Sequence, residues 1–276
     1  MNKKIPALLF IGMIVASAFA QNPEKANFNS FERTPEPFLF SVTTLTPQDL
    51  KWSLNYSSSY GERVEGPFGY DGVSQQFSVK GYLGSQFTLY ADAALGISHV
   101  GDVTSAQQVE IIRDILGGKK NTGIRLGIGL GVNNDFSNAK SLLSRITASF
   151  NTPEIMVSGN MLFEHTFTAN RDAVDVITNL GFHYHLTGNL SAGFEAVGED
   201  LEGFWDKEEA EGGAKLMVGP SLNFNPRKSG ISFAISGGPV IYATRNQLTN
   251  PDAVRELPSQ SGLILRASIL FKLPGS

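Results

Sequence analysis

Two histidines and one glutamate lie close together in the stretch NLGFHYHLTGNLSAGFEAV, and these residue types could bind a metal ion or move protons. His183 and His185 are two positions apart, so a strand would place both rings on one face, about 7 Å apart. Glu195 would lie diagonally across a hairpin from His183. Two histidines without a third ligand at a fixed spacing are a weak metal signal. We therefore predict hydrogen bonding among polar side chains here, with no metal and no cofactor.

A second group of chemically capable side chains is the acidic stretch GEDLEGFWDKEEAEGG at 198–213. Its carboxylates could bind divalent cations, alone or together with lipid phosphates, while Phe204 and Trp205 pack back over the neighbouring surface. The stretch lacks the Asp and Asn spacing of a calcium-binding loop, and solvated charge is the simpler explanation. The acidic residues of this predicted outer loop are Asp200, Glu202, Asp206, Glu208, Glu209 and Glu211.

Strands must position these groups, because apolar residues occur at every second position along most of the chain. Leu180, Phe182 and Tyr184 share one face, and turn residues at 187–189 separate them from a second alternating run. Residues 107–116 also fit a short amphipathic helix capped at Ser105; we predict a strand, and a helix stays the alternative for 103–120. The alternating segments are 50–60, 76–83, 87–98, 107–116, 123–132, 142–150, 154–167, 174–186, 189–197, 214–224, 231–243 and 262–273.

The apolar face of these strands is predicted to meet lipid rather than a protein core. Several segments have 10 to 13 residues, whereas strands of soluble proteins have mostly about 5 to 6 and membrane-crossing strands about 9 to 11. Short and longer connections alternate, as do the periplasmic turns and outer loops of bacterial barrels. We predict an all-β protein, a transmembrane antiparallel up-and-down β-barrel of about 12 strands, within a range of about 10 to 12. An aromatic girdle would lie at the short-turn ends, formed by Trp52, Phe87, Phe150, Tyr184, Phe224, Phe233 and Phe271.

The opposite face carries charges of both signs that would line the lumen. These charges could form a network of ion pairs that fills or narrows the barrel, or a polar path that selects solutes. About twelve strands lie between the eight that side chains can fill and the sixteen of an aqueous porin, so the strand number leaves both open. The lumen-lining candidates are Lys51, Lys80, Asp92, Arg125, Arg145, Glu164, Asp175, His183, His185, Glu195, Lys215 and Arg266.

Two prolines and one arginine fit this arrangement poorly. Pro220 and Pro239 lie within predicted strands, where proline cannot donate a ladder hydrogen bond, so each should mark a bulge or a kink. Arg113 would face lipid, which costs less near a membrane interface than at mid-depth.

The N-terminal residues have the three parts of a secretory signal peptide: lysines at 3 and 4, an apolar run from 5 to 16, and Ala-Phe-Ala ending at Ala20. Cleavage after Ala20 would remove both lysines and take the formal net charge from −4 to −6, which argues against nucleic-acid binding. No cysteine is present, so the fold must be held without disulfides. Residues 21–48 are predicted to be a periplasmic extension, with a plug inside the lumen as the alternative, and residues 49–276 to be the barrel.

From Lys51 to Phe271 the pattern resembles the bacterial outer-membrane β-barrel class. The glycine-rich strands and the Val-Gly-Pro-Ser motif at 218–221 are similar to transporter-type barrels grouped with the phenol-degradation meta-pathway proteins. The resemblance implies the outer membrane of a diderm bacterium, with membrane lipid and the barrel-assembly machinery as partners. Members of the class usually end on an aromatic residue that this machinery reads, whereas here five residues follow Phe271. No functional residue of the class maps onto this sequence.

Passive passage or uptake of a small solute is therefore the expected function, and a closed structural or surface-binding barrel is the alternative. An enzyme acting on membrane lipid would need a serine, a histidine and an orienting polar residue together near the outer rim. His99 and His165 are the histidines expected near the longer loops. Gly-x-Ser-x-Gly is absent, and VSGN at 157–160 does not replace it. We predict no enzymatic activity.

Overall fold

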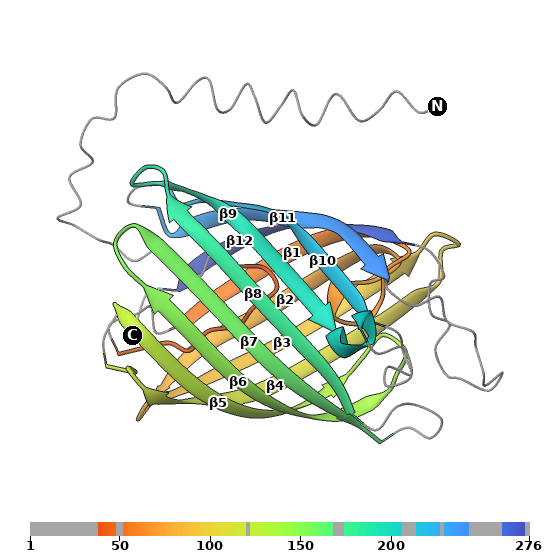
Figure 1. Cartoon of the computed structure of the whole chain (residues 1–276), viewed down its shortest axis with the longest axis horizontal. Coiled ribbons are helices and arrows are strands. Elements are labelled where there is room, and N and C mark those ends of the chain that lie inside the picture. Colours follow the sequence, from red (N-terminus) through yellow and green to blue (C-terminus); the bar gives the residue numbers. More distant parts are fainter. Residues whose placement is uncertain are drawn as a thin grey trace. The chain divides into compact units, whose positions relative to one another are not determined.

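The chain forms a closed β-barrel in the computed structural model, which describes residues 38–47, 52–119, 122–167, 174–205, 214–226, 229–242 and 261–273. Neighbours in the chain pair antiparallel all around the wall, and β1 pairs with β12 to close it (Figure 1). The predicted all-β up-and-down barrel of twelve strands is confirmed. The strands are β1 (Trp52–Glu62), β2 (Gly72–Gly84), β3 (Phe87–Ser98), β4 (Val103–Leu116), β5 (Gly123–Asn134), β6 (Lys140–Asn151), β7 (Ile155–Thr166), β8 (Val174–His185), β9 (Leu190–Glu199), β10 (Lys215–Phe224), β11 (Ile231–Tyr242) and β12 (Gly262–Leu273).

Strand β4 is the segment for which a helix was the alternative. It pairs with β3 on one side and β5 on the other. Glu110 and Ile112 are buried inside the barrel, whereas Ile111 and Arg113 are exposed on the outside, and this two-residue period belongs to a strand. The Arg113 guanidinium lies outward as predicted, with its central carbon 5.3 Å from the centroid of the Phe87 ring.

The outer face of the wall is apolar. In β5, Ile124, Ile128 and Leu130 are 51–65% exposed, while Gly127 and Gly129 face the lumen. Exposed apolar side chains recur on every strand, which is expected where lipid rather than water is the solvent. The seven aromatic residues predicted as a girdle all lie within three residues of the short-turn ends of their strands.

Pro220 and Pro239 lie where the β10–β11 ladder is interrupted. Pairing stops at Met217–Val240 and resumes at Ser221–Ser236 in the same register. Because proline has no N–H, the missing bonds fall where donors are absent. The prediction was a bulge or a kink: no residue is inserted between β10 and β11, so there is no bulge in this ladder, and the sheet accommodates the prolines by a gap.

The apolar core lies inside the barrel, at the end opposite the short turns. The β1–β2 connection, residues 63–71, contains the 3-10 helix η1 (Gly66–Phe68) and enters the lumen, where Val64 and Phe68 are 1% and 0% exposed. A second 3-10 helix, η2 (Leu201–Phe204), follows β9. The loop side chains pack against inward residues of seven strands, namely Leu143, Leu162, Ile177, Val197, Met217, Val240 and Ile264.

No helix in the described ranges is long and apolar enough to cross a membrane.

Residues 38–47 lie inside the barrel, with hydrogen bonds to inward side chains of β3, β4, β7, β9 and β12. The predicted periplasmic position is therefore wrong for these residues, which take the alternative position in the lumen. The physical reason is that carboxylate, amide and hydroxyl groups of the wall satisfy their main-chain polar groups. The remainder of 21–48 and the predicted signal peptide at 1–20 lie outside the described residues.

Candidate functional site

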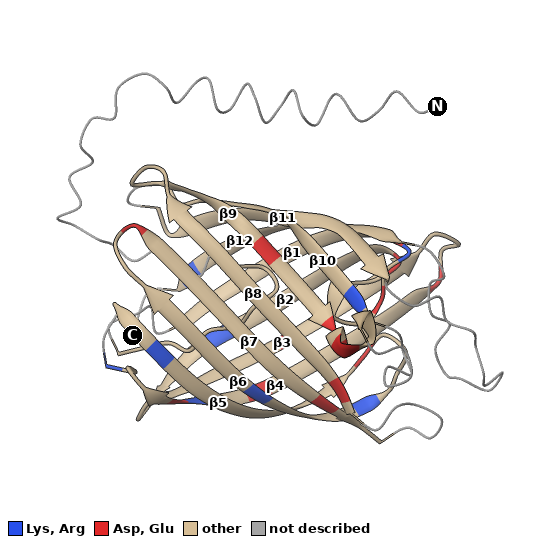
Figure 2. Cartoon of the chain, viewed as in Figure 1, with Lys and Arg blue, Asp and Glu red and all other residues tan. Residues whose placement is uncertain are grey.

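Eleven of the twelve predicted lumen-lining residues lie in the described part of the chain, and all eleven occupy inward positions. Lys51 lies outside the described residues. Lys80, Asp92, His185 and Arg266 are half-buried. Charged positions are sparse along the strands (Figure 2), so hydroxyl and amide groups make up most of the polar lining. The remaining seven candidates are at most 6% exposed: Arg125, Arg145, Glu164, Asp175, His183, Glu195 and Lys215.

Arg145 on β6 and Glu110 on β4 form a buried two-point ion pair. The Arg145 Nε lies 2.7 Å from Glu110 Oε2 and its second terminal nitrogen 2.6 Å from Oε1. The other terminal nitrogen donates to Asn160 Oδ1 at 3.1 Å. Glu110 is not among the predicted lumen-lining residues, because its segment also fits a helix; as a strand with Arg113 outward, the same segment places Glu110 inward. In such a pair each buried charge is compensated by the other, so both can lie in the lumen.

Lys215 on β10 connects the wall to the entering loop. Its Nζ lies 2.8 Å from Glu199 Oε2 on β9 and 3.3 Å from Glu65 Oε1 in the 63–71 connection. Lys215 is fully buried, so these carboxylates are its compensation. The contact to Glu65 holds the loop in the lumen together with the apolar cluster.

The histidines singled out in the sequence take part in hydrogen bonds, as predicted. His183 Nε2 lies 2.9 Å from Ser221 Oγ, and Ser221 donates to Glu195 Oε1 at 2.8 Å. His185 Nδ1 lies 2.8 Å from Ser191 Oγ. In a Ser-His-acid triad the carboxylate bonds the imidazole, whereas here it accepts from the serine. The arrangement is a hydrogen-bonded chain rather than an activated nucleophile.

The two histidines expected near the longer loops have other contacts. His99 Nε2 lies 3.3 Å from Asp71 Oδ1, with both side chains about half exposed. His165 packs edge-on against Phe167, with ring centroids 5.3 Å apart. Neither arrangement is that of a base held beside a serine nucleophile.

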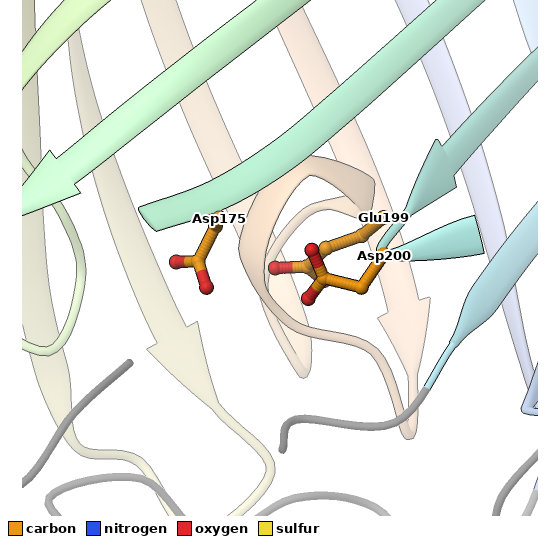
Figure 3. A group of neighbouring side chains, drawn as sticks. All are labelled: Asp175, Glu199 and Asp200. Atoms are coloured by element: carbon orange, nitrogen blue, oxygen red, sulfur yellow. The ribbon is translucent and has the colours of Figure 1, made fainter. Parts of the chain in front are cut away.

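Three buried carboxylates converge where β8 and β9 meet the longer loops (Figure 3). Asp175, Glu199 and Asp200 each offer an oxygen within 4.8 Å of the others. Burial raises the pKa of Asp200 to about 7, and the Glu199 and Asp175 carboxylates add to this, although the Val176 N–H hydrogen bond opposes it. Of the predicted acidic group, Asp200 and Glu202 are described, while Asp206, Glu208, Glu209 and Glu211 lie outside the described residues.

A cavity of about 480 Å³ runs along the lumen beside residues 38–42. Tyr70 and Phe136 in the longer loops line it, as do Ser53 and Leu270 near the short-turn end. Polar side chains of β1 and β2 form much of its wall. Charges of both signs face it, from Lys80, Asp92, Arg145, Glu164 and Arg266.

Comparison with known proteins gives a likeness of fold. No family model matches the chain, and no curated protein matches it. A solved structure of the KdgM porin in complex with disordered oligogalacturonate superposes with a TM-score of 0.55 at 10% identity, covering 80% of this chain and 99% of that one. The NanC porin superposes with a TM-score of 0.54 at 11% identity, covering 80% and 100%. The chain, a barrel of twelve strands, therefore shares its fold with porin barrels of the bacterial outer membrane.

Proposed function

We propose that the protein is an outer-membrane channel that lets a small polar solute pass through its lumen without catalysis. The observation that carries this proposal is the cavity of about 480 Å³ along the lumen, which charged side chains of both signs help to line. The porin fold of the wall supports the same function.

Membrane lipid would contact the exposed apolar face, and the barrel-assembly machinery would insert the chain. Binding of divalent cations by the acidic loop stays a prediction: added calcium should raise the melting temperature of chelated protein.

Planar-bilayer recording of the purified full-length chain tests the channel. Stepwise conductance is expected, and Glu164→Gln should shift the reversal potential in a salt gradient toward anions, because it removes a negative charge that faces the cavity. Glu62→Gln is the control, because it also removes one negative charge but Glu62 does not line the cavity. The Glu62 carboxylate instead pairs with Arg63 at 3.0 Å. A silent bilayer with correctly folded protein would refute passage.

A closed barrel is the second candidate. It is favoured by the material inside the lumen, where residues 38–47 and the 63–71 loop occupy space that an open porin leaves to water. The planar-bilayer recording separates the channel from the closed barrel, because a closed barrel gives no conductance while its fold is intact.

A further inference from the structure

Residues 38–47 are held in the lumen chiefly through their main chain. Glu195 Oε2 accepts hydrogen bonds from the N–H groups of both Leu39 and Phe40, each at 2.9 Å. Thr88 Oγ1 accepts from the Leu45 N–H at 2.8 Å. Arg266 on β12 donates a hydrogen bond to the Leu39 carbonyl oxygen at 3.0 Å.

Asn160 on β7 pairs with both main-chain polar groups of one residue, as a neighbouring strand would. Its Oδ1 accepts from the Val42 N–H at 2.6 Å, and its Nδ2 donates to the Val42 carbonyl at 2.9 Å. Because every non-proline residue carries these two groups, such contacts recognise a peptide main chain whatever the side chain at that position.

Two aromatic pockets add side-chain selectivity at one end of this track. The Phe38 ring meets His183 edge-on at 5.0 Å, and it fills the space that a Cβ on Gly181 would need, 2.3 Å from the ring. The Phe40 ring lies under the Arg266 guanidinium at 4.3 Å. An aromatic residue at the first and third positions is therefore preferred.

We propose that this track is a binding site for the main chain of a non-helical peptide with such aromatic residues, and that residues 38–47 are its internal, replaceable ligand. Residues 38–42 line the adjoining cavity of about 480 Å³, so this part of the segment has free space beside it. The site lies in the lumen of the proposed channel and adds a second ligand to its small polar solute, although binding itself does not require conduction.

Proline substitution tests the main-chain contacts selectively. Val42→Pro with Leu45→Pro removes the two N–H donors to Asn160 and Thr88, whereas Val42→Ala with Leu45→Ala keeps them and is the matched control. A fluorescent peptide with the sequence FLFSVTTLTP is then titrated against each full-length protein. The proline protein should bind it at least about tenfold more tightly than the alanine or unaltered protein, because its own segment no longer competes at high effective concentration. A peptide carrying prolines at the same two positions should not compete.

Equal binding by the proline and alanine proteins, or none by a correctly folded proline protein, overturns the proposal. If the proline protein fails to fold, labelling of Ser41→Cys replaces the titration, since the chain has no other cysteine and Ser41 is 7% exposed. Asn160→Ala should then speed thiol labelling about tenfold and Asn223→Ala should not; equal rates overturn the proposal. Peptide binding without conductance would refute the channel alone, and conductance without peptide binding would refute this site alone.

Discussion

The buried charges of Arg145 and Glu110 are tolerated in this lumen because each side chain contacts a partner of opposite sign on another strand. Arg145 and Glu110 come from strands that are not neighbours, and both side chains are almost fully buried, at 4% and 0% exposure. Desolvation of each ion is offset only while the other is present.

Glu110→Gln should lower the free energy of unfolding by about 3 to 5 kcal/mol, because Arg145 then stays charged in a buried site without its carboxylate. Glu62→Gln, which breaks a half-exposed pair with Arg63, should change it by less than about 1 kcal/mol. Urea unfolding in lipid vesicles measures both. Similar losses for the two variants would contradict the importance of burial here.

Asp200 should make stability depend on pH. Its pKa is raised from 3.8 to about 7 in the folded protein, so the folded state binds the proton more tightly than the unfolded state. The contribution of Asp200 to the free energy of unfolding is therefore complete below about pH 4, and it is lost as the pH rises through about 7.

The difference in free energy of unfolding between the unaltered protein and Asp200→Asn should consequently favour the unaltered protein more at pH 5 than at pH 8. Asparagine tolerates the left-handed backbone at this position, where φ is 47°, so the substitution adds little strain. Asp102→Asn in an exposed loop controls for the loss of one negative charge. A pH-independent difference would show that Asp200 titrates at its ordinary pKa.

At the scale of elements, the gap between β10 and β11 shows how a closed sheet accepts two prolines. The strands still approach closely within the gap, where a Cβ on Gly219 would lie 1.9 Å from the Gly237 carbonyl oxygen. Glycine is therefore required there by space rather than by backbone conformation.

Gly219→Ala should destabilise the barrel by about 3 kcal/mol, since the neighbouring strand must move. Gly159→Ala in β7 is the matched control: its Cβ would meet its nearest atom, the Asn179 carbonyl oxygen, at 3.6 Å, and the cost should be below about 1 kcal/mol. Heat-induced mobility shift on gels and urea unfolding give the comparison. An equal tolerance of both alanines would mean that the strands separate easily at the gap.

For the whole molecule, the decisive property is the apolar outer surface that surrounds the polar lumen. Ile146 lies near the middle of β6 and is 48% exposed, whereas Arg113 lies beside Phe87, the first residue of β3 at the short-turn end. Depth in the bilayer should therefore set the cost of charge on this surface.

Ile146→Arg should reduce the free energy of unfolding in lipid vesicles by about 2 to 4 kcal/mol, as expected for a cation at the bilayer midplane. Removal of the native cation by Arg113→Leu should change it by less than about 1 kcal/mol, because that position lies near an interface. An Ile146→Arg protein as stable as the unaltered one would indicate water, not lipid, at the centre of the wall.

The sequence alone predicted the strands, a number of about 10 to 12, their antiparallel order and most of the side chains that point inward, because side-chain alternation and loop length are local properties of the chain. Even the ambiguous segment at 107–116 was predicted as a strand. Only the tertiary structure decided that Glu110 meets Arg145, that loop 63–71 packs on an internal apolar cluster, and that residues 38–47 enter the lumen. These contacts depend on the register and closure of all twelve strands, which bring together groups up to 227 positions apart, and no local pattern encodes such a contact.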